Sequence, residues 1–212
     1  MAYSEEQIKE LRKKVSARLG EKRFLHTLGV ERMAAVLAKK ILPEKEMEIR
    51  AAALLHDITK EYSVQKHIDI IREHLSFVSE SDMVAASVYH SLTAPFVIKN
   101  EFSEYADEDI LSAVLNHTVG APDMSVFDEI IFISDYIEEG RTYPVCVALR
   151  EKLLSGMSVC SDASECVMLL HDATIESLDN TIVSLVKRGD FLHEKTVMTR
   201  NAFLSKRPMP LK

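Results

Sequence analysis

The sequence predicts an all-α fold, and three observations support this prediction. Only six glycines and six prolines occur among 212 residues, which leaves little turn chemistry. Alanine, leucine, glutamate and lysine, which favour helices, are abundant. Apolar residues recur at helical spacing, and no stretch shows the sustained apolar and polar alternation of a half-buried strand. We therefore expect a bundle of helices without a sheet.

The first half of the chain divides into expected helices at residues 4–19, 21–41, 44–56, 63–75 and 79–90. Ser4 and Gln7 have the spacing of a capping box at the start of the first helix. Gly20 ends this helix, and Pro43 stops the second. Ser79 caps the last of them, an apolar-periodic segment that reaches His90.

In the second half, helices are expected at residues 110–116, 125–139 and 160–187. Before them, Pro95 and an acidic stretch bracket a short element and a loop, and residues 119–123 form a turn. Gly140 ends the helix at 125–139. We place the main domain at residues 1–188. The segment 189–212 mixes basic residues with prolines, and we interpret it as a solvated tail or a partner-binding arm.

Composition and charge exclude several classes of protein. A net charge of −7 disfavours nonspecific binding to nucleic acid, although metal ions and a few basic side chains would still attract a small polyanion. The longest apolar stretches are far shorter than the roughly 18 residues that a membrane span needs. The chain starts without the basic and apolar regions of a secretory signal, so we expect a cytoplasmic protein.

The cysteines are interpreted as packing residues. There are three of them, Cys146, Cys160 and Cys166, and none belongs to a Cys-x-x-Cys motif. An odd number without this spacing suits a reducing compartment. We therefore expect neither disulfides nor a thiolate zinc site.

The adjacent His56 and Asp57 are the most informative residues of the chain. They follow an apolar run at residues 51–55, and further candidate ligands lie elsewhere in the sequence: His26, His90, His117 and Asp135. Imidazole and carboxylate ligands suit Zn, Fe, Mn or Ni, and they are typical of hydrolytic metal centres rather than thiolate structural ones. The sequence therefore predicts a metal-dependent hydrolase.

A near copy of this pair serves as a control within the same chain, because residues 169–172 repeat the Leu-Leu-His-Asp of residues 54–57. The copy, His171-Asp172, lies inside a long helical pattern, and we interpret its histidine as partly exposed and outside any metal site. The remaining histidines, unlike the six candidate residues, also lie in polar stretches of sequence. These histidines are His67, His74 and His193.

Each candidate ligand has an alternative role when it is taken alone. His26 shares an apolar stripe with Val30, which also suits a hydrogen-bonded core histidine. Asp135 interrupts an apolar helix, where a carboxylate needs either an arginine partner or a cation. His90 and His117 lie at expected helix ends, as histidines that interact with a helix dipole do. Their shared placement at helix ends or on core-facing stripes favours a single metal site.

Four segments resemble one known family: residues 23–30 (RFLHTLGV), 54–60 (LLHDITK), 117–120 (HTVG) and 134–141 (SDYIEEGR). The order of His26, His56-Asp57 and Asp135 is similar to the metal signature of the HD-domain phosphohydrolase superfamily. Together the segments, which span about residues 23–150, resemble its YqeK-type family. The resemblance implies a helical bundle with a metal centre between the helices and symmetrical hydrolysis of bis(5'-nucleosyl) tetraphosphates.

Two positions depart from the family pattern. Ser134 replaces the alanine that usually precedes the aspartate, which is a small change. Glu139-Gly140 replaces the usual proline-containing step before Arg141, and this change bears on the loop that holds Arg141.

The resemblance also implies roles for individual residues. The implied metal ligands are His26, His56, Asp57 and Asp135. The ion is expected to be iron, with Mn, Zn, Ni, Co or Mg as alternatives. The implied catalytic residues are Asp57, Lys60 and Arg141. The implied substrate-binding residues are Arg23, Asp57, Ile58, Thr59, Lys60, His90, His117, Thr118, Tyr136 and Arg141. His90 and His117 bind either a second ion or the phosphates, and Tyr136 either lines the nucleotide pocket or packs in the core.

We expect the protein to hydrolyse diadenosine tetraphosphate and related dinucleotides to two nucleoside diphosphates. One alternative is an HD-type phosphohydrolase for another nucleotide, such as a phosphate monoester or a guanosine alarmone. Another is a non-catalytic nucleotide sensor. The expected partner is a small dinucleoside polyphosphate, with no nucleic acid and no membrane, and the assembly state stays open between a monomer and a homodimer.

Overall fold

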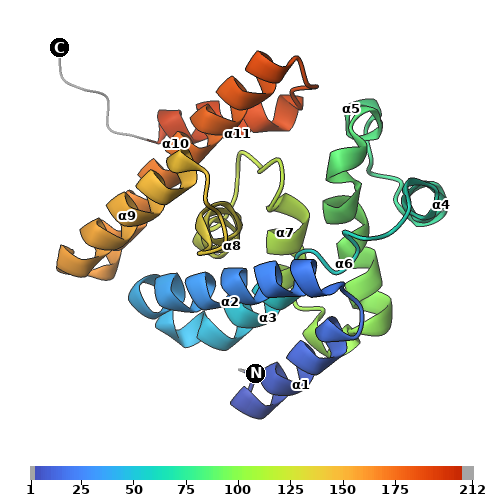
Figure 1. The fold of residues 1–212 in the computed structure, drawn as a ribbon, viewed down its shortest axis with the longest axis horizontal. Helices are drawn as coiled ribbons and strands as arrows, with labels where there is room; N and C mark the ends of the chain where they lie inside the picture. Colours follow the sequence, from blue (N-terminus) through green and yellow to red (C-terminus); the bar gives the residue numbers. More distant parts are fainter. Residues whose placement is uncertain (1–2, 207–212) are drawn as a thin grey trace.

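The computed structural model describes residues 3–206, and within this range the chain forms eleven α-helices and no strand (Figure 1). The helices are α1 (Glu5–Ser16), α2 (Glu21–Ile41), α3 (Glu46–Leu55), α4 (Val64–His74), α5 (Glu80–Val84), α6 (Tyr89–Glu101), α7 (Glu108–Asn116), α8 (Val126–Ile137), α9 (Pro144–Val159), α10 (Ala163–Arg188) and α11 (Glu194–Ser205). Short 3-10 turns lie at Pro43–Lys45, Ala86–Val88 and Ser103–Tyr105. The expected all-α fold is confirmed. None of the helices in the described range is long and apolar enough to cross a bilayer.

Serine side chains start several helices where the sequence predicts them. Ser4, Ser79 and Ser125 form capping boxes, in which the cap residue and the residue three positions later bond reciprocally. Ser63 caps α4 by accepting a hydrogen bond from a backbone N–H of the first turn. Gly189 ends α10 in the left-handed conformation, with a φ of 69°. These boundaries therefore follow from local sequence.

Residues 79–101 differ from the expectation. The helix expected at 79–90 is interrupted at Ala85, whose ψ of 93° is extended, so His90 lies in the first turn of α6 rather than at a helix end. Pro95 lies inside α6, although an internal proline costs about 3 kcal/mol. Packing of α6 against α4 and α7, which fully buries Ala94, offsets this cost.

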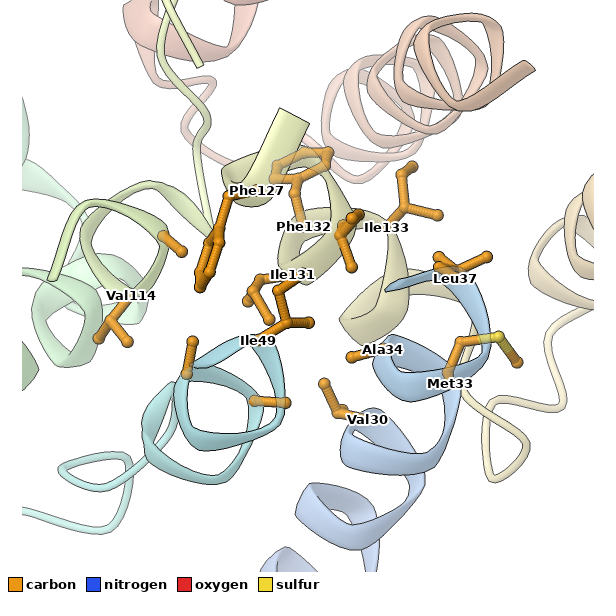
Figure 2. Close-up of a cluster of buried hydrophobic side chains, with 14 of the residues drawn as sticks. Val30, Met33, Ala34, Leu37, Ile49, Val114, Phe127, Ile131, Phe132 and Ile133 are labelled. Carbon is orange, nitrogen blue, oxygen red and sulfur yellow. The ribbon is translucent and has the colours of Figure 1, made fainter. Parts of the chain in front are cut away.

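The core lies between α2, α3, α7 and α8, which pack against one another. Figure 2 shows the apolar side chains that meet there: Val30, Met33, Ala34 and Leu37 of α2, Ile49 of α3, Val114 of α7, and Phe127, Ile131, Phe132 and Ile133 of α8. Burial of one such large side chain contributes about 1.5–3 kcal/mol. The same four helices carry or directly precede every candidate metal ligand except His90, so core packing also sets the positions of the ligands.

The cysteines contradict the expectation that none forms a disulfide. Cys160, which follows α9, is bonded to Cys166 in the first turn of α10. The chain turns back between these helices, where Asp162 caps α10, and this turn brings the two Cα atoms to 6.1 Å. A disulfide spans such a distance. Cys146 is free and buried, as expected of a packing residue. An odd number of cysteines therefore did not exclude a disulfide between two cysteines that are close in the sequence.

The expectation of a solvated tail is wrong for residues 194–205, which form α11. This helix packs against α10, and its Phe203 is 1% exposed. Asp82 of α5 holds the start of α11, because its Oδ1 accepts hydrogen bonds from His193 Nε2 at 2.9 Å and Lys195 Nζ at 3.1 Å. The mixed composition of this segment gave no indication that His193, Lys195 and Phe203 hold it against the rest of the fold. Residues 207–212 of the expected tail, which include Arg207, Pro208 and Pro210, lie outside the described residues.

Candidate metal centre and phosphate site

The six candidate ligands meet in one place although they come from distant parts of the chain. They are His26 in α2, His56 and Asp57 just after α3, His90 in α6, His117 just after α7 and Asp135 in α8. Their donor atoms form three overlapping groups of three, and within each group all atoms lie within 4.8 Å of one another. The structure thus assembles a cluster of four imidazoles and two carboxylates.

Asp57 lies at the centre of this cluster, and each of its carboxylate oxygens faces a different pair of histidines. Oδ2 is 3.4 Å from His56 Nε2 and 3.8 Å from His26 Nε2. Oδ1 is 3.3 Å from His90 Nε2 and 3.7 Å from His117 Nε2. A carboxylate in this position has the geometry to bridge two ions or to serve one ion on either side.

The electrostatics of the cluster keep both carboxylates ionised. Burial by itself raises the pKa of Asp57, but the imidazoles of His56 and His117 outweigh it and hold the pKa well below its usual value. Burial likewise raises the pKa of Asp135, and the hydrogen bond from His26 and the charge of Arg141 lower it far more. Ionised carboxylates are the form in which these residues bind a cation.

Backbone contacts fix the ring orientation of two histidines of the cluster, and burial affects the charge of a third. The Nδ1 atoms of His56 and His117 lie 2.7 Å from the carbonyl oxygens of Ala53 and Val114, so each Nδ1 carries the proton and donates. Burial, followed by the charges of His117 and Lys60, lowers the pKa of His90 well below its usual value and keeps this ring neutral.

The orientation of these rings tests whether the residues fit a metal ion. Nε2 of His56 is fully buried and has no hydrogen-bond partner, yet it points at the ionised Asp57. A buried acceptor nitrogen without a donor is costly unless a cation or a water fills the gap. The backbone contacts behind the rings are of the kind that orients metal-binding histidines. The donor set therefore fits a metal ion.

Glu138 supports the cluster from behind, and reasoning from the sequence did not assign it a role. Its Oε1 lies 3.1 Å from His26 Nδ1, and its Oε2 accepts the Gly140 N–H at 2.6 Å. Burial alone lowers the pKa of His26, but hydrogen bonds to Asp135 and Glu138 raise it to about 9. A Cβ atom on Gly29 would lie 2.3 Å from Glu138 Oε2, so only glycine leaves room for this carboxylate. The sequence offered one sign of this contact, namely Gly29, a residue without a side chain about one turn after His26.

Three cationic side chains surround the cluster. Arg23 Nη1 is 2.8 Å from Asp57 Oδ2, and Arg141 Nη2 is 2.8 Å from Asp135 Oδ1. Lys60 Nζ is 3.0 Å from His90 Nε2, and burial lowers the pKa of this lysine. Charges that converge on a ligand cluster can neutralise a bound polyphosphate.

The loop before Arg141 still delivers this residue to the cluster despite its departure from the family pattern. Arg150 Nη1 donates to the backbone carbonyls of Glu138, Ile137 and Arg141 at 2.8 to 3.3 Å. This one guanidinium therefore holds the turn in shape, and Glu139-Gly140 does not displace Arg141.

The other residues expected to bind substrate divide into two groups. Thr118 Oγ1 lies 3.1 Å from Nε2 of both His90 and His117, within the cluster. Thr59, Ile58 and Tyr136 are placed differently. Ile58 is buried in the apolar core, and Thr59 Oγ1 donates to the carbonyl of His90 at 2.9 Å. Tyr136 packs against the core, where burial and the nearby Cys146 raise its pKa to about 12.

The sequence suggested that the histidines outside the cluster lie in polar surroundings, unlike the candidate ligands. His171 of the near copy is partly exposed, as predicted, and its Nδ1 pairs with Glu129 at 2.8 Å, away from the cluster. For His67 and His193 the expected polar surroundings are wrong, because both are buried. Thr93 and Asp82 supply their hydrogen-bond partners, and only the tertiary fold brings these partners close. Burial alone therefore does not mark a ligand.

A cavity of about 770 Å³ adjoins the cluster on the side of α2 and the turn after α8. It is lined by His26, Arg23 and Arg141, and by residues that the sequence did not single out, including Lys22, Arg32 and Tyr143. Its size lies within the roughly 300–1,000 Å³ of small-molecule sites, and its basic side chains suit a phosphorylated ligand. The cavity therefore reaches the cluster at His26.

The fold and the site together define a helical domain with a buried histidine and aspartate metal centre. The HD domain family matches residues 23–140, and the chain belongs to this family. The matched segment contains all six candidate ligands.

Individual relatives extend this likeness over nearly the whole chain. The symmetrical bis(5'-nucleosyl)-tetraphosphatase of Halalkalibacterium halodurans is 31% identical over 90% of this chain and 93% of its own length. The protein of the same name from Bacillus subtilis is 29% identical over 90% and 94%. A Clostridium acetobutylicum crystal structure, described as a predicted HD superfamily hydrolase involved in NAD metabolism, is 32% identical and has a TM-score of 0.80. That match covers 98% of this chain and 100% of the other.

Proposed function

We propose that the protein hydrolyses bis(5'-nucleosyl) tetraphosphates, such as diadenosine tetraphosphate, to two nucleoside diphosphates. The observation that carries this proposal is the position of Asp57, whose two oxygens face separate pairs of histidines while basic side chains approach from both sides. A cluster with positive charge on both sides suits a substrate with a phosphate chain in the middle. Relatives that are similar over 90% of this chain carry the name of this activity.

The metal is part of the proposal. His26, His56, Asp57 and Asp135 would hold one ion, which we propose to be iron, because mixed imidazole and carboxylate sites suit this metal. His90 and His117 would hold a second ion together with Asp57 Oδ1. A bound ion lowers the pKa of water and neutralises phosphate charge, which is the chemistry that phosphoanhydride hydrolysis requires.

The side chains of the cluster have distinct tasks in this mechanism. Arg23 and Arg141, which pair with cluster carboxylates, would turn their free N–H groups to nonbridging phosphate oxygens. Lys60 lies beside the histidine pair and would neutralise charge on the leaving oxygen, which we assign to a nucleoside diphosphate. Asp57 would orient both histidine pairs, one through each carboxylate oxygen. Thr118 adds a hydroxyl donor next to His90.

Of the other residues in the implied substrate set, Ile58 and Thr59 would act by placing Asp57 and Lys60. Ile58 anchors the turn in the core, and Thr59 binds the backbone of α6 through the carbonyl of His90. Tyr136 would support the site from the core side. These roles are indirect, since none of the three side chains lies in the large cavity.

The products of the reaction test the proposal. We expect diadenosine tetraphosphate to yield two molecules of ADP in early time points separated by chromatography, and the chelator EDTA to slow the reaction. ATP and AMP as first products would mean attack at an outer phosphorus. Free phosphate from nucleotide monoesters, or binding without turnover across a nucleotide panel, would favour a different HD-type hydrolase or a sensor.

The role of His90 and His117 is tested separately. If they hold a second ion, the double substitution to alanine lowers the metal content per chain, as measured by elemental analysis of protein purified without added metal. If they contact phosphate, metal content stays and the KM rises. The same elemental analysis of the unchanged protein tests whether the resident metal is iron.

A further inference from the structure

A second cavity, of about 270 Å³, adjoins the cluster, and it shares no lining residue with the larger one. The larger cavity borders the cluster at Arg23, whose Nη1 lies 2.8 Å from Asp57 Oδ2. The smaller cavity borders it at Lys60 and His90, and His90 Nε2 lies 3.3 Å from Asp57 Oδ1. Asp57 therefore lies between the two cavities, with one carboxylate oxygen facing the border of each.

The lining of the smaller cavity combines the basic Lys60 with aromatic, apolar and hydroxyl side chains. Besides the lysine it is formed by Tyr62, His67 and Val64, and Ser87 contributes an exposed hydroxyl. Both rings are held in place, because Tyr62 Oη accepts a hydrogen bond from Arg18 at 2.5 Å and His67 Nδ1 lies 2.8 Å from Thr93 Oγ1. These rings lie beside two cations, Lys60 and Lys66, and Lys66 Nζ is 3.4 Å from the centroid of the Tyr62 ring. Fixed rings beside cations suit a base whose sugar carries a phosphate.

The volume of this cavity limits what it can bind. At about 270 Å³ it lies just below the roughly 300–1,000 Å³ of sites that enclose a whole small ligand. It suits part of a ligand, with the remainder at the metal centre. The neighbouring Lys60 marks the point where a phosphate would enter.

We infer that the smaller cavity binds the nucleoside of one half of the dinucleotide, while the larger cavity binds the other half and the phosphate chain crosses the cluster. This inference rests on the proposed function, since only a ligand with a nucleoside at each end fills both cavities. It assigns substrate recognition to Val64, Tyr62, His67 and Ser87, which lie on α4, on the 3-10 turn Ala86–Val88 and on the loop before α4.

The test fills the smaller cavity and compares two ligands. Val64 is 53% exposed at the start of α4, so Val64→Trp adds bulk to the cavity without disturbing the core. Ser87→Trp adds bulk from a different element, the 3-10 turn Ala86–Val88, in case one variant fails to fold. Val183→Trp on α10 is the matched control, because Val183 is 50% exposed and lines neither cavity.

The measured quantity is the ratio of the KM for diadenosine tetraphosphate to the inhibition constant of adenosine tetraphosphate. The inhibitor has one nucleoside, which the larger cavity takes. We expect the ratio to rise at least about tenfold in Val64→Trp and Ser87→Trp, the scale of ~1.4 kcal/mol of lost binding. In Val183→Trp it should match the unchanged protein. Circular dichroism and thermal unfolding check that each variant is folded.

The outcomes separate this inference from the proposed function. If the unchanged protein hydrolyses the dinucleotide but the ratio is the same in folded Val64→Trp and Ser87→Trp, the assignment of the smaller cavity is wrong. If the unchanged protein, loaded with metal, does not hydrolyse the dinucleotide, the proposed function is wrong and the inference is overturned with it.

Discussion

Replacement of Gly29 by alanine is expected to weaken metal binding through Glu138. A Cβ atom at position 29 would lie 2.3 Å from Glu138 Oε2 and 3.2 Å from its Cδ. Ordinary contact begins near 3.4 Å, so the carboxylate has to move by about 1 Å. Both of its oxygens are held, one near His26 Nδ1 at 3.1 Å and one by the Gly140 N–H at 2.6 Å. The movement therefore breaks or lengthens the contact that orients His26.

The size of the effect follows from the function of such supporting contacts. Loss of a partner behind a metal-binding histidine typically costs roughly 10- to 100-fold in metal affinity or activity. We expect Gly29→Ala to fall in this range. Without the clash, the same change in a helix would stabilise the protein by about 0.8–1.0 kcal/mol, because alanine is the better helix former. A drop in thermal stability would therefore also report the clash.

The assay is titration of metal-free protein with Mn²⁺ by calorimetry, together with the turnover of diadenosine tetraphosphate. Gly156→Ala is the matched control, since its Cβ would meet Leu169 Cδ1 at 2.9 Å, also in a helix but away from the cluster. This control should change stability and leave metal affinity unaltered. Metal affinity in Gly29→Ala equal to that of the unchanged protein would refute the supporting role of Glu138.

Three further predictions concern single charged side chains. Asp57→Asn should remove metal and nearly abolish turnover, whereas Asp172→Asn in the near copy should leave both intact; equal losses in two folded variants would contradict the distinction. Arg141→Ala, whose guanidinium contacts Asp135, should lower kcat by at least about tenfold with metal content unchanged, and unaltered kinetics would exclude it from the charge-neutralising set. Asp82→Asn should lower the free energy of unfolding at pH 7 by about 1–3 kcal/mol, because Asp82 is 1% exposed and holds Lys195. Burial raises the pKa of Asp82, but hydrogen bonds from Ser79 and Lys195 outweigh it and lower the pKa below the usual 3.8. The stabilisation by Asp82 is thus present above pH 3.8 and lost as the pH falls through the lowered pKa, so urea unfolding of Asp82→Asn should depend less on pH in that range.

Much of the helical architecture is predictable from local sequence, because its causes are local. The caps Ser4, Ser63, Ser79 and Ser125 start helices through bonds to residues three positions away. Gly189 ends α10 because glycine accepts a positive φ at low cost. Pro95 is the exception, since its place inside α6 depends on packing against α4 and α7.

The candidate ligands are also visible in the sequence, but the evidence for them is of two kinds. Residue type and helical phase identified His26 and Asp135 as polar groups on apolar stripes. The choice of His56-Asp57 over His171-Asp172 depended on context and on resemblance, and the structure places only the first pair in the cluster. The same reasoning placed His67 in polar surroundings, although this histidine is buried and its Nδ1 lies within hydrogen-bond distance of Thr93 Oγ1.

By itself, the sequence determined the helical class, most helix boundaries and the residue types of the centre, because these depend on neighbours within one or two turns. The tertiary structure alone decided which oxygen of Asp57 faces which histidines, that Glu138 supports His26, and that two cavities meet the cluster. These features join residues up to 112 positions apart, as in the contact of His26 with Glu138. Such contacts depend on how whole helices pack, and no local pattern in the chain encodes their distances.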